Sequence, residues 1–239
     1  MKPVMLALSA LSFLSLNLLT ACGPTPGTAP SANPSTSPTT SPTTNPTSSP
    51  TASPTSNPSS APATVQVTQV SGCAQPANNL VSNGDFETPS VGQTWRVFTG
   101  STLTGWQIPT GNIELVGTAF EAAEGVQSLD LVGSASGEIS QSVATQAGTA
   151  YMLSFCLAGN PGGDPKVKEL DVLWNGTSIA TLSFDTTGKT TTAMGWQGYR
   201  IEIPAGMTSG AASLGFRNKA SGADTYFGPM LDNIGVSAL

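Results

Sequence analysis

Apolar and polar residues alternate along several short segments in the C-terminal part of the chain. In residues 151–157 every second side chain, from Tyr151 to Leu157, is large and apolar, which is typical of a strand with one buried face. The same period of two recurs in residues 169–174 and 199–203, where charged residues occupy alternate positions. No segment keeps a helical period over its length. The pattern predicts an all-β domain.

Turn-forming Gly, Asn, Asp and Pro residues separate these segments and divide the region beyond residue 65 into about eleven strands. The pair Asn175-Gly176 is a two-residue hairpin signal between two of them. The predicted strands lie at residues 79–82, 105–108, 112–116, 128–132, 138–143, 150–157, 167–174, 178–184, 199–203, 211–217 and 231–236. Many short strands with frequent turns are typical of a two-sheet antiparallel β-sandwich.

The N-terminal residues have the pattern of an export signal. Lys2 precedes an apolar run at residues 4–19 that polar residues interrupt, so it is too short and too polar for a span of about 20 apolar residues. The ending LTAC at residues 19–22 resembles a bacterial lipobox, which implies a signal peptide at residues 1–21 and lipidation of Cys22. We therefore expect an exported lipoprotein, held by its lipid in a membrane at the cell surface or outer membrane.

The composition changes after the cysteine. Residues 22–70 are predicted to be the lipidated Cys22 and a disordered stalk rich in Pro, Ser and Thr. Proline recurs at every fourth position from Pro26 to Pro62, which favours extended polyproline II segments. The alternative is a tolerated low-complexity segment with no spacer role. Residues 71–239 are predicted to be the folded domain, which is long enough to form one core without a metal or a disulfide.

Charge and residue usage exclude several functions. The net charge is −6 and only 9% of residues are charged. Binding to a nucleic acid backbone depends on clustered Lys and Arg, so we expect no nucleic acid partner. The chain contains no histidine, which removes Ser-His and Cys-His nucleophiles and imidazole metal ligands. A carboxylate-only hydrolase stays formally open, but no carboxylate pair stands out. We expect a protein that binds and does not catalyse.

The chain has three cysteines, of which one lies near the N-terminus and two lie in the predicted folded domain. Cys22 belongs to the lipobox, and this leaves Cys73 and Cys156 as an even pair in an exported, oxidising setting. A disulfide between them is the prediction. The alternative is two separate thiols.

Motifs at the two ends of the folded region resemble a known group of domains. The sequence NLVSNGDFE at residues 79–87 and the sequence LDNIGV at residues 231–236 resemble galactose-binding-like jelly rolls, which include many carbohydrate-binding modules. Residues 122–131, 157–161, 184–188 and 194–196 look like the bacterial choice-of-anchor C family, which is related to a domain of unknown function in plant cell-wall proteins. The resemblance covers nearly all of residues 79–237. It implies a jelly roll with its first and last strands side by side. It also implies a monomer that binds a polysaccharide or cell-envelope glycan.

The same resemblance implies a structural calcium ion. Calcium prefers six to eight oxygen ligands from carboxylates and carbonyls, and the adjacent end strands would bring several acidic positions together. The implied ligands are the Asp85 carbonyl, the Glu87 carboxylate, Glu124, the Gln127 carbonyl and Asp232. The alternative leaves no metal: Asn83 and Asp85 cap a turn, Glu87 and Glu124 are solvated, and Asp232 accepts backbone hydrogen bonds.

A sugar site needs exposed aromatic rings beside polar groups, and few aromatic residues are available. Trp95, Trp106, Trp196 and Tyr226 lie beside Gly or polar residues, where a loop could expose them, and Trp196 and Tyr226 are the favoured pair. Each of the four could instead belong to the core. The sequence thus predicts a surface lipoprotein that displays a non-catalytic carbohydrate-binding module. The alternative is a structural or adhesive envelope protein with protein partners and no sugar site.

Overall fold

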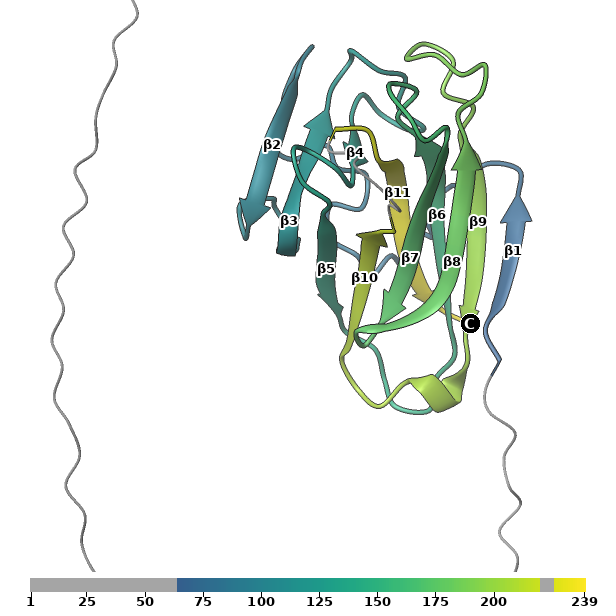
Figure 1. Cartoon of the computed structure of the whole chain (residues 1–239). Helices are drawn as coiled ribbons and strands as arrows, with labels where there is room; N and C mark the ends of the chain where they lie inside the picture. Colours follow the sequence, from purple (N-terminus) through teal and green to yellow (C-terminus); the bar gives the residue numbers. More distant parts are fainter. Residues whose placement is uncertain (1–63, 220–225) are drawn as a thin grey trace, which may run out of the picture. The chain divides into compact units, whose positions relative to one another are not determined.

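The computed structural model describes residues 64–219 and 226–239, which form a β-sandwich (Figure 1). Its strands are β1 (Gln66–Val70), β2 (Trp95–Gly100), β3 (Gln107–Val116), β4 (Ser128–Asp130), β5 (Glu138–Val143), β6 (Tyr151–Gly159), β7 (Val167–Trp174), β8 (Thr177–Asp185), β9 (Gln197–Ile203), β10 (Ala212–Asn218) and β11 (Pro229–Ala238). A 3₁₀ turn, η1 (Ala205–Met207), follows β9. Neither described range has a helix long and apolar enough to cross a membrane. The predicted signal peptide, Cys22 and the stalk up to residue 63 lie outside the described residues.

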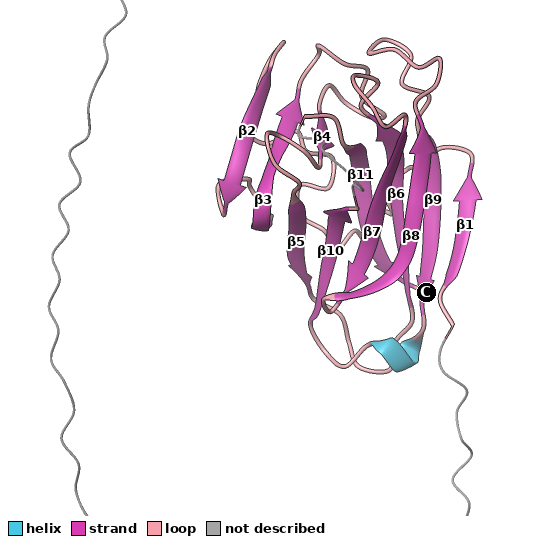
Figure 2. Cartoon of the chain, viewed as in Figure 1, coloured by secondary structure: helices cyan, strands magenta, loops and turns pink. Residues whose placement is uncertain are grey.

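Antiparallel pairing arranges the strands in two sheets that share β3 (Figure 2). One sheet has the order β1-β9-β6-β11-β4-β3-β2, and the other has the order β3-β5-β10-β7-β8. The C-terminal half of β3 pairs with β2 and β4, whereas its N-terminal half pairs with β5. The strand therefore passes from one sheet to the other. The predicted two-sheet antiparallel jelly roll is confirmed.

The core lies between the sheets and follows the period of two in the sequence. On β6 the predicted inward residues, from Tyr151 to Leu157, are all buried. Phe155 of one sheet meets Phe216 of the other edge to face, with ring centroids 5.1 Å apart. Trp174 fills the same core from β7, and its indole nitrogen donates to the Met207 carbonyl at 3.1 Å. Burial of these large apolar side chains is the main stabilising term of the fold.

Most predicted strands are present. Residues 105–108 and 112–116, predicted as two strands, form the single strand β3, and the Asn175-Gly176 hairpin connects β7 to β8 with both residues at positive φ. Strands β1 and β2 were not predicted, and most of their side chains are exposed. Because β1 pairs with β9, the sheet begins before the predicted domain boundary at residue 71.

The opening motif is the main departure from the predicted strands. Residues 79–82 lie beside β11 but form no strand, since Asn79 replaces part of the ladder: its Oδ1 accepts from the amides of Val81 and Val236 at 2.9 and 3.0 Å. Backbone bonds from Leu80 to Val236 and from Ile234 to Gly84 complete the contact. The opening and closing segments therefore lie side by side, although only β11 has strand geometry.

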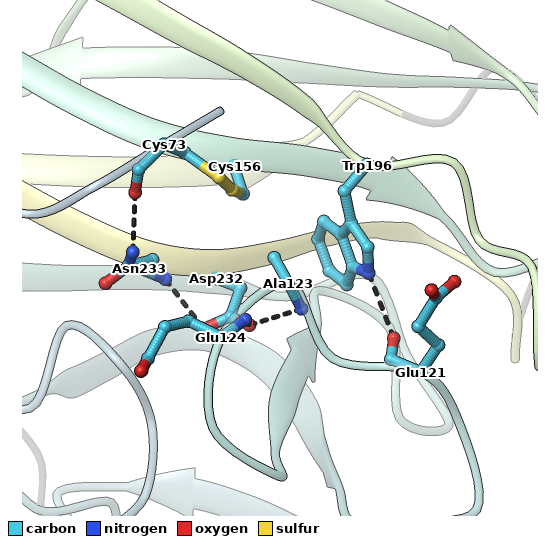
Figure 3. The surroundings of a disulfide bond; sticks show 8 residues. All are labelled: Cys73, Glu121, Ala123, Glu124, Cys156, Trp196, Asp232 and Asn233. Carbon is cyan, nitrogen blue, oxygen red and sulfur yellow. Dashed lines mark hydrogen bonds between the residues drawn. A yellow bond between two sulfur atoms is a disulfide. The ribbon is translucent and has the colours of Figure 1, made fainter. Parts of the chain in front are cut away.

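A disulfide joins Cys73 to Cys156, with 5.4 Å between their Cα atoms (Figure 3). Cys156 lies on the face of β6 that points away from Phe155 and Leu157. Asn233 of β11 also contacts this segment, because its side-chain amide donates to the Cys73 carbonyl. The segment after β1 is thus fastened to the outer face of two central strands.

Candidate functional site

A cavity of about 300 Å³ opens on the outer face of the first sheet, where β2, β3 and β4 lie together. Ile113 and Leu115 of β3 point into the core, so the alternate residues Glu114 and Val116 face outward. Trp95 of β2 is the register partner of Val116 and lies on the same side. The lining residues are Trp95, Glu114, Val116, Phe120, Gly133, Asn160, Tyr226 and Phe227.

Aromatic rings form the walls of this cavity. Trp95 is 59% exposed and Tyr226 is 58% exposed, which is unusual for side chains of this size. Phe227 is held by two glycines: a Cβ atom at Gly162 or Gly163 would overlap its ring. The loop after β6 therefore owes its glycines to a close contact that shapes one wall. Exposed aromatic rings around a concave surface are typical of ligand sites.

Two buried polar residues, Asp130 and the lining residue Asn160, bond to each other beside the cavity. Asp130 is fully buried on β4, and its Oδ2 accepts from the side-chain amide of Asn160 at 2.8 Å. Its Oδ1 accepts from the amides of Val132 and Gly228 at 2.9 and 3.0 Å. Burial raises the pKa of Asp130 to about 8, while these hydrogen bonds act in the opposite direction. Asp130 thus joins β4 to the end of β6 and to the segment that follows Phe227.

Glu114 is the accessible carboxylate of the cavity. The part of the chain that the structure describes gives its side chain no hydrogen bond and no ion pair. Partial burial raises the pKa of Glu114 to about 7, so it titrates near neutral pH. A half-buried and unpaired carboxylate among aromatic rings is a mark of a functional site.

Sequence reasoning found two of the cavity residues and missed the others. Trp95 and Tyr226 were candidates, whereas Glu114 and Asn160 were not singled out. A signal for Glu114 was present, because it is an acid inside the apolar stretch Ile113–Val116 of a predicted strand. No comparable signal marks Asn160, which enters the cavity only through folding.

The other two candidate tryptophans lie elsewhere. Trp106 is only 1% exposed and packs against Phe86, with ring centroids 5.8 Å apart. Its indole nitrogen donates to the Asn83 carbonyl at 3.0 Å. The expectation that Trp106 could line a binding rim is wrong, because the opening motif covers this ring.

Trp196 lines a second hollow of about 410 Å³ beside the disulfide (Figure 3). Its ring is half-buried, and its indole nitrogen donates to the Glu121 carbonyl at 2.9 Å. The hollow also contains Glu124 and Asn233. Trp196 and Tyr226, the favoured pair, therefore belong to different hollows.

The predicted calcium positions meet at the loop of residues 122–127. Asp232 is fully buried, and its Oδ2 accepts from the amides of Ala123 and Glu124 at 2.8 and 3.0 Å (Figure 3). Glu87 reaches the same loop from the opening motif, and its Oε1 accepts from the amides of Val126 and Gln127 at 2.7 and 2.9 Å. The opening and closing segments thus hold one loop between them.

The remaining positions contribute in other ways. The Gln127 side chain donates to the carbonyls of Phe86 and Pro89 at 2.7 and 3.1 Å and accepts from the Val91 amide at 2.6 Å. Glu124 is exposed and extends its carboxylate away from Asp232, and Asp85 is half-buried in the opening turn.

The residue set does not fit a calcium cage as it stands. Among the described residues no group of three or more His, Cys, Asp and Glu side chains could hold a metal ion. The oxygens of Asp232 and one oxygen of Glu87 face N–H donors, which a cation would have to displace. Burial and the nearby charge of Glu87 raise the pKa of Asp232 to about 8, against the pull of its three N–H partners. Calcium binding at these positions stays a prediction.

The family model described as "Protein of unknown function (DUF642)" matches residues 79–237, which is more than half of the chain. The chain belongs to this family. The predicted relationship to a domain-of-unknown-function family is confirmed. The DUF642 region begins at the opening motif, ends in β11 and contains every residue that lines the cavity.

Among curated proteins, the chain is 34% identical over 89 residues to halomucin from Haloquadratum walsbyi. That match covers 34% of this chain and 1% of halomucin, so the chain spans only a small fraction of that relative's length.

Several solved structures resemble the DUF642 sandwich. TmCBM61, solved in complex with beta-1,4-galactotriose, is 19% identical with a TM-score of 0.43, over 68% of this chain and 100% of that chain. A cyclase from Fischerella sp. TAU, solved with an indolyl ketone, is 16% identical with a TM-score of 0.43, over 66% and 96% of the two chains. CBM35 from Paenibacillus barcinonensis is 22% identical with a TM-score of 0.39, over 60% and 99%. None of these likenesses says what this chain binds.

Proposed function

We propose that this chain is an exported surface lipoprotein whose β-sandwich is a non-catalytic carbohydrate-binding module. The saccharide would occupy the cavity between Trp95 and Tyr226. One observation carries the proposal: two exposed aromatic rings flank a concave site that also presents the carboxylate of Glu114. A sugar ring has an apolar face that stacks on an aromatic ring and hydroxyl groups that require polar partners.

The arrangement of Glu114 and Asp130 supports binding and not hydrolysis. A typical glycosidase places two carboxylates on either side of the scissile bond. Glu114 reaches the cavity, but Asp130 is fully enclosed and its oxygens accept three hydrogen bonds from the protein. Among the described residues, the site therefore offers one carboxylate to a ligand.

A glycan array and affinity gels with the purified full chain test the proposal. We expect retention by at least one polysaccharide and about tenfold weaker binding for Trp95→Ala or Tyr226→Ala, since each removes an aromatic contact. Trp196→Ala is the matched control, because Trp196 lies in the second hollow. If only Trp196→Ala weakens binding, the glycan site lies in the second hollow. Indifference to every glycan, together with capture of envelope proteins, would favour the adhesive alternative.

The lipid anchor is a separate part of the proposal and rests on the sequence around Cys22. We expect wild-type protein to incorporate labelled palmitate and to sediment with membranes, and Cys22→Ala to do neither. If the two forms sediment equally and neither is labelled, the anchor proposal is wrong, and the proposed binding site is not affected by that result.

A further inference from the structure

Glu114 brings a negative charge into the cavity that the described protein does not neutralise. Its carboxylate has no ion pair or hydrogen bond within residues 64–219 and 226–239. Burying an unpaired charge is unfavourable, so such a group is stabilised either by a proton or by a positive partner. Burial raises the pKa of Glu114 to about 7, so a proton can serve this purpose at mildly acidic pH.

Neighbouring charged groups do not supply the missing partner. Asp130 is the register partner of Glu114 on β4 and adds a second acidic group. Arg96 lies on the opposite face of β2, where its guanidinium is 4.4 Å from the centroid of the Phe98 ring. The ammonium of Lys168 is 5.9 Å from the centroid of the Phe227 ring. No Lys or Arg is among the lining residues that the structure describes.

The aromatic walls favour a positive ligand as well. Trp95, Phe120, Tyr226 and Phe227 surround the same space as Glu114. The face of an aromatic ring attracts a cation within about 6 Å, most strongly for tryptophan, and aromatic cages bind ammonium groups in this way. A carboxylate inside such a cage adds a charge-assisted hydrogen bond.

We propose that the saccharide unit bound in this cavity is an amino sugar with a free, protonated amine, which pairs with Glu114 and contacts the rings of Trp95 and Tyr226. This inference rests on the proposed carbohydrate-binding function and names its ligand class. A volume of about 300 Å³ is small for a ligand pocket and suits one sugar unit of a longer glycan.

Charge also decides which glycans the site rejects. A uronic acid would place its carboxylate beside that of Glu114, and like charges in a partly dry site repel. An N-acetylated unit carries no charge, so it leaves Glu114 without a partner. The net charge of −6 attracts a cationic polysaccharide to the whole protein, at a rate that salt lowers.

Calorimetry with the full chain tests the inference with three oligosaccharides of equal length: deacetylated glucosamine, N-acetylglucosamine and galacturonic acid. We expect the glucosamine oligomer to bind at least about tenfold more tightly than the other two. Glu114→Gln should remove this preference, whereas the matched variant Glu202→Gln, which neutralises an exposed acid on β9, should keep it. Affinity should rise as the pH increases from about 5 toward neutral, because Glu114 ionises, and it should fall again at higher pH, where the sugar amine loses its proton. Glu114→Gln should flatten this rise.

The outcomes separate this inference from the function on which it rests. If wild type binds a neutral or acidic glycan as tightly as the amino sugar, and Trp95→Ala still weakens that binding, the saccharide site stands and the amine inference is overturned. If Glu114→Gln keeps the preference while its melting temperature matches wild type, the amine inference is also overturned. If wild type binds no glycan, the proposed function itself fails.

Discussion

The side-chain amide of Asn160 donates to the buried carboxylate of Asp130 at 2.8 Å. In Asp130→Asn, two side-chain amide groups would meet at this contact and leave an N–H donor without an acceptor. This should lower the free energy of unfolding by about 1–3 kcal/mol, the range for a buried unsatisfied polar group. Glycan binding should weaken as well, because Asp130 also holds Gly228, next to Phe227. Chemical denaturation and calorimetry measure the two effects.

Exchanging the two side chains provides the control for this contact. In the double variant Asp130→Asn/Asn160→Asp an amide at 130 can donate to a carboxylate at 160, so part of the lost stability should return. A double variant less stable than the sum of both single changes would show that the contact does not govern this region.

Stability should fall as the pH rises from about 4 to about 8. Burial raises the pKa of both Asp130 and Asp232 to about 8, so the folded chain keeps protons in this range that the unfolded chain has released. The unfolded state then binds fewer protons, and the free energy of unfolding decreases with pH. Urea unfolding at several pH values, with a chelator present, measures the slope. A stability that rises steadily over this interval would contradict the protonated form of both groups.

Gly125 is expected to be sensitive to substitution. Its φ is +64°, and a Cβ atom there would overlap the Glu87 carboxylate that holds the loop of residues 122–127. Gly125→Ala should lower the free energy of unfolding by more than Gly188→Ala, whose φ of +74° is similarly strained but whose Cβ would meet nothing within 4 Å. The difference isolates the contact with Glu87. Equal losses would show that backbone strain alone decides the outcome.

Removing the disulfide should destabilise the domain. The bond joins residues 83 positions apart, and its loss by Cys73→Ser/Cys156→Ser should lower the free energy of unfolding by about 2–5 kcal/mol. Reductant should lower the stability of wild type and leave the variant unchanged. Two alkylatable thiols in native, unreduced protein would mean that the bond does not form.

Calcium can be tested by scanning calorimetry with chelator and with added calcium. Because N–H donors occupy the oxygens of Asp232, equal melting temperatures of wild type under the two conditions would support the metal-free alternative. A rise with calcium that Asp232→Asn abolishes would instead establish the predicted site.

The predictability of the site differs from residue to residue. Trp95 and Tyr226 are exposed and line the cavity, whereas Trp106 is buried, although all three have polar or glycine neighbours in the sequence. Local composition cannot separate them, because exposure depends on which distant segment covers each ring. Trp106 is covered because residues 83–86 fold over it.

The sequence by itself determined the all-β class, since the period of two in residues 151–157, 169–174 and 199–203 requires one apolar face that packs on a core wherever the strand lies. The resemblance carried by the motifs at residues 79–87 and 231–236 implied that the opening and closing segments meet, and backbone hydrogen bonds between them confirm it. Only the tertiary structure decided the cavity, because Trp95, Glu114, Asn160 and Tyr226 come from four separate segments. Likewise, only the folded chain shows that N–H groups face the carboxylates of Glu87 and Asp232, since the direction of each donor is set by the backbone of a distant loop.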